Sequence, residues 1–209
     1  MNPTINELQN GGEFELIARL NHHEIKEFVI RQLTANGKMV RIFMVYQIFM
    51  VLLGIFFLTR SIVLAFNGNI QPLFYTGAAL VFSFSILVVI HELLHGMALK
   101  LTGAKKIAFG GYLRKFIFYA EADRHVLNRR QFAFVALTPL IVVKAATLSG
   151  VILFVHQPVF YFFILIMSAH SLFCAGDIGL LSLFYQFKGT DVYTFDVKEE
   201  KRSYYYKRT

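Results

Sequence analysis

Four long apolar stretches, separated by short polar segments, dominate the pattern of this chain. No Asp, Glu, Lys or Arg lies between Arg41 and Arg60, between Arg60 and His91, or between Lys144 and Asp177. A helix that spans a bilayer needs about 20 mostly apolar residues, and helices satisfy their own backbone groups within lipid. The pattern therefore predicts an all-α polytopic membrane protein with four transmembrane helices, over residues 41–66, 72–101, 131–155 and 158–187.

The segments outside these stretches predict a simple domain organisation. Residues 1–40 form a small cytoplasmic N-terminal region, residues 41–187 the membrane domain, and residues 188–209 a cytoplasmic tail. Within the first region, Asn21 is a suitable N-cap for a helix with apolar residues at helical spacing after it. The tail alternates apolar and polar residues in "DVYTFDV", which predicts a short strand.

The connection between the second and third apolar stretches mixes apolar, aromatic and basic residues. It reads "KIAFGGYLRKFIFYAEA", in which Gly110-Gly111 indicates a turn. We expect a short interfacial hairpin or loop there, on the cytoplasmic side of the membrane.

Composition and charge agree with a membrane protein and orient it. The chain is 56% hydrophobic with a mean hydropathy of +0.53, above the range of ordinary soluble domains. Its net charge of +8 is concentrated in residues 96–130 and in the mixed-charge tail, whereas connections 67–73 and 156–158 carry no Lys or Arg. Positive residues remain on the cytoplasmic side, so both termini should be cytoplasmic. The lipid bilayer is the expected partner of this basic surface, and no motif indicates nucleic acid.

The stretch "HELLH" places three ionisable side chains in one turn of the second apolar stretch. His91 and His95 are four residues apart, so on a helix they share a face and can bind one metal ion. Glu92 lies beside that face, where it can act as general base on a metal-bound water. Ionisable groups within a membrane span are costly and usually mark function, so we favour a Zn²⁺ site over two structural histidines.

A catalytic zinc usually has three protein ligands, and Asp177 is the preferred third ligand. Asp177 lies 11 residues before Lys188 and His91 lies 9 residues before Lys100, so both are predicted at a similar depth. His170 is the alternative ligand, but it would lie deeper; a pocket-lining or hydrogen-bonding role is equally compatible with the sequence.

Three further residues stand out in the last two stretches. Pro139 predicts a kink because it removes a backbone donor, and with His170 and Lys144 it is a candidate residue of the pocket around the metal or of the contacts that support its ligands. Lys144 is costly inside a span, so it should reach a polar pocket or the membrane surface. Cys174 is the only cysteine, which excludes an intramolecular disulfide and a multi-cysteine metal site; we expect it to be a small buried residue.

These features together resemble a family of small bacterial membrane proteins described as zincin peptidases. The residues that carry the resemblance are "HELLHG", "GAKKIAFGGYLRKF", "FVALTPLIVV" and "HSLFCAGDIGLL". The pattern of a motif late in one helix and an aspartate in a later helix is also similar to the site-2 protease class of intramembrane metalloproteases. In this chain "AGDIG" stands in place of the stretch that surrounds the late aspartate in that class.

The resemblance implies a zinc-dependent, HExxH-type metallopeptidase in the bacterial cytoplasmic membrane. It implies Zn²⁺ held by His91, His95 and Asp177, with Glu92 as general base, and a membrane or membrane-proximal peptide as substrate. Residues Ile107, Phe109, Gly110, Gly111 and Tyr112 could dock that substrate as an added strand. The alternatives are a non-proteolytic membrane binding protein and a transporter with a metal or proton site. The sequence does not indicate an oligomeric state.

Overall fold

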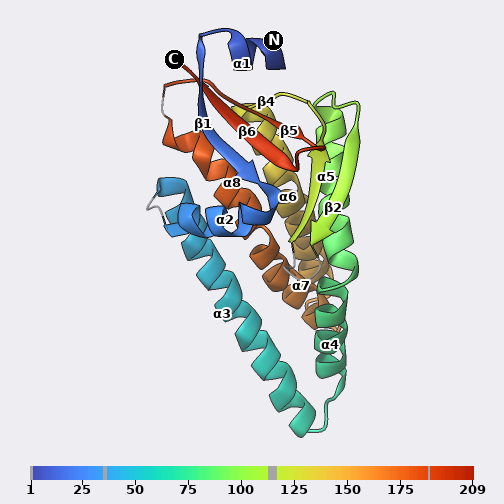
Figure 1. Cartoon of the computed structure of the whole chain (residues 1–209). Helices are drawn as coiled ribbons and strands as arrows, with labels where there is room; N and C mark the ends of the chain where they lie inside the picture. Colours follow the sequence, from blue (N-terminus) through green and yellow to red (C-terminus); the bar gives the residue numbers. More distant parts are fainter. Residues whose placement is uncertain (1, 35–36, 113–116, 188) are drawn as a thin grey trace. The chain divides into compact units, whose positions relative to one another are not determined.

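The fold combines helices with two antiparallel sheets. It is known from a computed structural model that describes residues 2–34, 37–112, 117–187 and 189–209 (Figure 1). The elements, in chain order, are α1 (Ile5–Asn10), β1 (Phe14–Asn21), the 3₁₀-helix η1 (His22–Glu24), α2 (Ile25–Thr34), α3 (Lys38–Phe66), α4 (Gln71–Ser83), α5 (Ile86–Leu101), β2 (Ile107–Tyr112), β3 (Ile117–Ala122), β4 (Leu127–Asn128), α6 (Arg129–Leu153), α7 (Phe160–Phe173), α8 (Ala175–Gln186), β5 (Val192–Val197) and β6 (Arg202–Arg208).

The prediction of an all-α fold is wrong. A four-stranded antiparallel sheet has the order β1-β6-β5-β4, and β2 and β3 form a second, two-stranded sheet. The strand expected in the tail is confirmed as β5, but β1 and β6 were missed. β1 pairs with β6 from Phe14↔Arg208 to Asn21↔Arg202, so the paired residues are separated in sequence by nearly the length of the chain. Pairing over that distance stabilises strands whose local sequence alone gives only a weak signal.

The prediction of four continuous transmembrane helices is also wrong. Among the described residues, α3 and α6 are each long and apolar enough to span a membrane. The other two predicted spans are pairs of helices: α4 and α5 meet at an angle of 46°, and α7 and α8 at 44°. At the first break the Ser85 hydroxyl donates to the Val81 carbonyl at 2.6 Å, and at the second the Cys174 thiol lies 3.4 Å from the His170 carbonyl. Such bonds from a side chain to the preceding turn bend helices.

The surface of α3 is strongly apolar. Its Val45, Phe49 and Phe56 side chains are 59–69% exposed. Exposed apolar side chains in a contiguous row along a 29-residue helix suit the hydrocarbon of a bilayer and would be unfavourable in water. Two to four helices of this protein therefore have the length and composition of membrane spans.

The chain divides into two compact units. Unit 1 consists of Met1–Val40, Glu92–Thr138 and Gly176–Thr209, and unit 2 of Arg41–His91 and Pro139–Ala175. Unit 1 contains both sheets, and unit 2 is helical.

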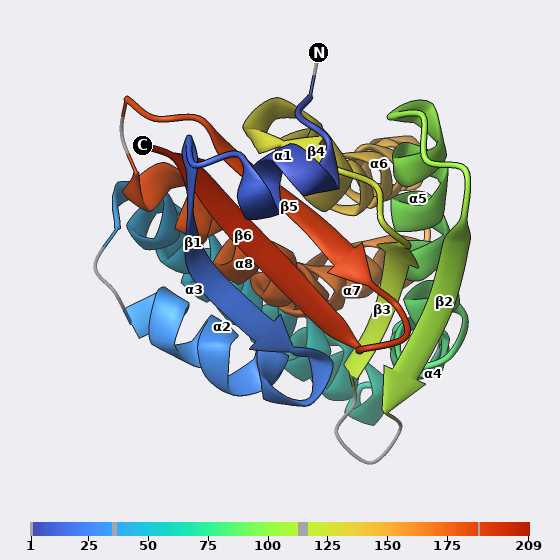
Figure 2. The same cartoon turned by 45° about the horizontal axis from the view of Figure 1, so that its top comes forward.

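Unit 1 has apolar clusters on both faces of its four-stranded sheet, which is seen with β6 between β1 and β5 in Figure 2. On one face, Tyr205 of β6 packs with Phe184 of α8 and Phe28 of α2. On the other face, Tyr206 packs with Phe195 of β5 and with Leu8 of α1. Neighbouring residues of a strand point to opposite faces, so the run "YYY" in β6 supplies both clusters.

The two-stranded sheet confirms the predicted hairpin but not its turn. β2 and β3 pair in register from Ile107↔Ala122 to Tyr112↔Ile117. The prediction of a turn at Gly110-Gly111 is wrong, because both glycines lie within β2. A Cβ at Gly110 would lie 2.5 Å from Cζ of Tyr119, so the ring of Tyr119 covers the glycine that it faces.

Unit 2 is held together by small and polar contacts between its helices. The Gln47 side chain of α3 donates to the Ser171 hydroxyl of α7 at 3.1 Å, and the Ser168 hydroxyl donates to the Met50 carbonyl. Phe82 of α4 and Phe162 of α7 pack with ring centroids 5.6 Å apart. Interhelical hydrogen bonds and close backbone approach are the usual means of association for helices in lipid.

Within unit 1, the substitution Gly179→Ala tests the packing of α8 against α2. A Cβ at residue 179 would lie 2.8 Å from Cγ1 and 3.3 Å from Cα of Val29, so α2 must shift. We expect the free energy of unfolding to fall by about 1–3 kcal/mol, which a thermal melt in detergent would record as a lower midpoint.

Gly176→Ala is the matched control, because a Cβ at residue 176 meets nothing within 4 Å. Alanine has the better helix propensity, so this variant should melt at the wild-type temperature or slightly above it. Equal midpoints for the two variants would contradict the close contact of α8 with Val29.

Candidate metal centre

The "HELLH" stretch lies in the middle of α5, as predicted. His91 and His95 are one helical turn apart, and both residues are buried, with 5% and 8% of their surface exposed. Glu92 is half-buried on the next position. Apart from Gly96 and Lys100, the rest of the helix consists of Leu, Val, Ile, Met and Ala, so the three ionisable groups of the motif lie in a largely apolar element. The unbroken helix fixes the two imidazoles on one face.

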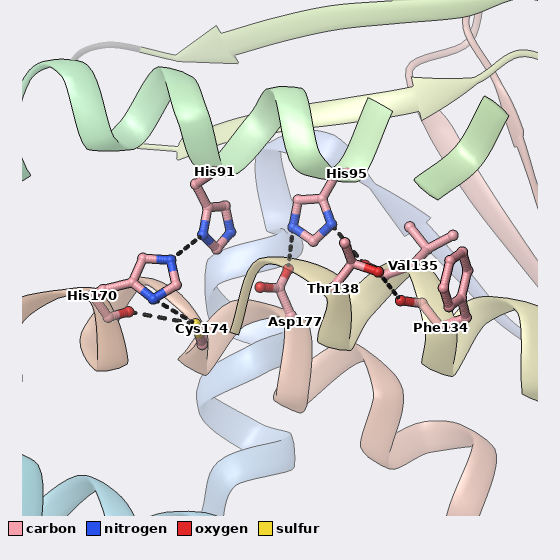
Figure 3. A network of polar contacts seen from close by, with 8 residues as sticks. All are labelled: His91, His95, Phe134, Val135, Thr138, His170, Cys174 and Asp177. Carbon is pink, nitrogen blue, oxygen red and sulfur yellow. Dashed lines mark hydrogen bonds and ion pairs between the residues drawn. The ribbon is translucent and has the colours of Figure 1, made fainter. Parts of the chain in front are cut away.

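Within unit 1, His95 and Asp177 form an ion pair. Nε2 of His95 lies 3.1 Å from Oδ1 of Asp177, and the two side chains are only 10% and 18% exposed (Figure 3). Asp177 lies in the first turn of α8, where the positive end of the helix dipole favours a carboxylate. The structure thus brings His95 of the motif together with Asp177, the aspartate that was predicted at a similar depth in the membrane.

The donor set fits a zinc ion. Two histidines and a carboxylate are a common protein ligand set of catalytic zinc. Bonds of about 2.0–2.1 Å in tetrahedral geometry put two ligand atoms roughly 3.3 Å apart, close to the 3.1 Å between His95 and Asp177.

Both imidazoles are also held at Nδ1. His95 donates from Nδ1 to the carbonyl of Val135 in α6 at 3.0 Å. Nδ1 of His91 shares a hydrogen bond of 3.1 Å with Nε2 of His170, within unit 2. When Nδ1 donates, as it does to the Val135 carbonyl, a neutral imidazole presents the lone pair of Nε2 as a metal ligand; His91 does so in the tautomer whose Nδ1 donates to His170. Figure 3 shows these contacts on the side of each ring away from its Nε2.

The acceptor of His95 is explained by Pro139. In an α-helix the carbonyl of residue 135 accepts from the N–H of residue 139, and proline has none. Pro139 lies inside α6, so the Val135 carbonyl is left for the His95 side chain. The sequence predicted a kink at Pro139, but not this contact, since it joins residues 40 positions apart. The signal in the sequence is the proline itself, because it leaves the carbonyl four residues before it without a helical donor.

His170 lies beside His91 in unit 2, and Cys174 lies beside His170. Both are fully buried in unit 2, and His170 Nδ1 is 3.7 Å from the Cys174 sulfur. The buried position expected for Cys174 is confirmed. Its contact with His170 was not predicted, although the spacing of four residues places the two side chains on one helix face.

Lys144 lies in unit 2. Its ammonium donates to the Met167 carbonyl at 3.0 Å and lies 5.0 Å from the centroid of the Tyr46 ring. These contacts account for a lysine inside α6 through a backbone acceptor and a cation–π interaction.

The residues proposed for substrate docking, Ile107 to Tyr112, form β2, which lies against the motif helix in unit 1. Phe109 is 53% exposed, yet its ring rests on Gly96, where a Cβ would lie 2.5 Å from Cζ of Phe109. Among the described residues, β2 pairs only with β3, so its other edge has no neighbouring strand. Gly96, directly after His95, thus allows this strand to approach the motif.

His22 does not take part in a metal cluster within the described residues. It is buried against the ring of Tyr119, at 4.8 Å between centroids, and its Nδ1 lies 3.9 Å from Glu121. Burial lowers the pKa of His22, which favours the neutral ring.

Comparison with known proteins identifies the family and nothing more specific. Residues 84–191, more than half of the chain, match the family described as "DUF3267: Putative zincin peptidase". No curated protein and no solved structure matched the chain. The matched segment contains the motif of α5, Pro139, His170 and Asp177. Because this match covers more than half of the chain, the chain belongs to the zincin peptidase family.

Proposed function

We propose that this protein is a membrane-embedded zinc metallopeptidase that hydrolyses a peptide bond in a membrane or membrane-proximal substrate. His91, His95 and Asp177 would hold the Zn²⁺, and Glu92 would be the general base. The observation that carries this proposal is that both motif imidazoles are held at Nδ1, with Nε2 of His95 facing Asp177. Membership of the zincin peptidase family supports it.

The chemistry divides between the bound ion and the side chains. Zinc, when bound, supplies a Lewis acid that polarises a carbonyl and lowers the pKa of water. The Glu92 carboxylate accepts a proton from the attacking water and returns it to the leaving amine. Asp177 balances charge next to His95, and the apolar surroundings of α5 limit access of bulk water. An intact motif with its glutamate favours this function over a binding protein or a transporter.

Pro139 has a positioning role in this proposal. By leaving the Val135 carbonyl without its helical donor, it provides the acceptor that orients the His95 ring. Partners that orient metal-bound histidines commonly contribute 10–100-fold to metal affinity. A residue outside the ligand set therefore determines how His95 faces the metal.

The free edge of β2 is the proposed docking site for an extended substrate. Asp123 donates its N–H to the Lys106 carbonyl. Hydrogen-bonded and non-hydrogen-bonded pairs alternate along an antiparallel ladder, so the even-numbered residues of β2 are the ones that bond to β3. The N–H and C=O groups of Ile107, Phe109 and Gly111 consequently point away from β3, toward the free edge. A substrate strand added there would lie beside the turn of α5 that carries His95.

Zinc content and peptidase activity of variants test the proposed centre. Purified wild-type protein should hold at least one zinc per chain and cleave members of a random peptide library, as read by mass spectrometry. Glu92→Gln should retain the zinc content of the wild type and lose activity by a factor of about 100 or more. His95→Ala and Asp177→Asn should each hold one zinc per chain less than the wild type. A wild-type protein without stoichiometric zinc would overturn the proposal, and full zinc and activity in Asp177→Asn would exclude Asp177 as a ligand.

Pro139→Ala tests the orientation of His95. The new N–H at residue 139 competes for the Val135 carbonyl, so we expect zinc affinity to fall about 10–100-fold in a competition titration with a chelator. Thr138→Ala is the control, because its hydroxyl bonds to the Phe134 carbonyl and not to Val135. Unchanged zinc affinity in Pro139→Ala would remove Pro139 from the mechanism.

Gly111→Pro tests the docking edge. Proline removes an outward N–H of β2 without removing a bond to β3, whereas Gly111→Ala keeps that N–H. We expect kcat/KM for peptides to fall about tenfold in the proline variant, the loss of one to two hydrogen bonds, and to stay near wild type in the alanine variant. Equal cleavage by both variants would argue against strand addition at β2.

A further inference from the structure

A second set of metal-ligating side chains lies within unit 2. His91, His170 and Cys174 each offer one ligand atom, and these atoms lie within 4.8 Å of one another. All three residues are buried, His170 and Cys174 completely. The set shares His91 with the proposed peptidase centre but includes neither His95 nor Asp177.

The arrangement of donor atoms suits a metal ion. Nδ1 of His91 and Nε2 of His170 are 3.1 Å apart, near the roughly 3.3 Å that separates two nitrogen ligands of one zinc ion. With one ligand atom taken from each residue, the Cys174 sulfur lies within 4.8 Å of a nitrogen of both histidines, and a nitrogen and a sulfur on one zinc ion are about 3.5 Å apart. The packing of α7 against α5 thus brings the three donors close together, and a small adjustment of the Cys174 side chain completes the site.

The chemistry of the donors selects the ion. Two imidazoles and a thiolate are soft to borderline ligands, which prefer Zn²⁺, Cd²⁺ or Cu⁺ to Mg²⁺ or Ca²⁺. The proposed peptidase centre has a carboxylate in place of the thiolate and is the harder of the two. A thiophilic cation would therefore discriminate between the two sets.

We propose that His91, His170 and Cys174 form a second metal site for a thiophilic d¹⁰ cation, and that its occupation inhibits the peptidase. Binding at Nδ1 of His91 replaces the hydrogen bond to His170 that holds this ring. The ring proton of His91 then lies on Nε2, so His91 is lost as a ligand of the catalytic ion, and the Cys174 thiol releases its proton when it binds the cation. The binding site stands on the geometry alone, whereas the inhibition rests on the proposed function.

The site can be tested with Cd²⁺ on the full-length protein in detergent. A thiolate bound to Cd²⁺ gives an ultraviolet charge-transfer absorption, which we expect in the wild type. The band should be lost in Cys174→Ser and His170→Ala and retained in His95→Ala and Asp177→Asn. Thermal melts of the variants check that each remains folded. If a variant does not remain folded, the absorption band is measured instead on wild-type protein whose Cys174 has been blocked by a thiol reagent. The band should then be absent.

Three outcomes would overturn the proposal. They are absence of the band in the wild type, its persistence in His170→Ala, and its loss in Asp177→Asn, which would assign the thiolate to the peptidase centre. Inhibition is read separately: Cd²⁺ should reduce peptide cleavage by the wild type at least tenfold more than by Cys174→Ser. If no peptidase activity is found, the proposed function fails, while the absorption band still decides the metal site.

Discussion

The orientation of two imidazoles inside an apolar helix is the constraint on which the candidate centre depends. A histidine ring in such surroundings has few polar neighbours, so each hydrogen bond that it makes determines which nitrogen is left for other ligands. His95 is oriented by a backbone carbonyl of α6 and His91 by another histidine of α7. The two neighbouring helices therefore do more than fill space around α5, because each holds one ring of the motif.

The sequence predicted the parts of the centre that follow from regular spacing. The spacing of four positions from His91 to His95 places both on one face of a helix, and a count from the basic ends of two apolar stretches predicted Asp177 at a similar depth. The contact of His95 with Val135 was beyond such reasoning, because it depends on how α5 and α6 pack. Pro139 was predicted as a kink and as a candidate residue of the pocket, but not as the reason why the Val135 carbonyl is left for His95.

The fold was predicted less well than the site, for a physical reason. Apolar stretches of more than 20 residues report on the membrane directly, whereas a strand of six to eight residues is stabilised by its partner. β1 carries Phe14, Leu16, Ala18 and Leu20 at alternate positions, a weak signal beside the helix that follows it. Gly110 and Gly111 suggested a turn because glycine is common there, but the ring of Tyr119 requires a glycine within the strand. Bends within two apolar stretches were invisible to hydropathy, since both halves are equally apolar.

The order of strands in the larger sheet has a consequence for biosynthesis. β6, formed by residues 202–208, lies between β1 and β5, so it is the strand that joins the start of the chain to its later part. During translation the apolar helices leave the ribosome and can enter the membrane while β1 still has no partner. The sheet can close only after residues 202–208 have emerged from the exit tunnel. The segment that carries Glu92 and His95 belongs to the same compact unit as this sheet. Completion of that unit therefore requires a strand that is synthesised after all of its helices.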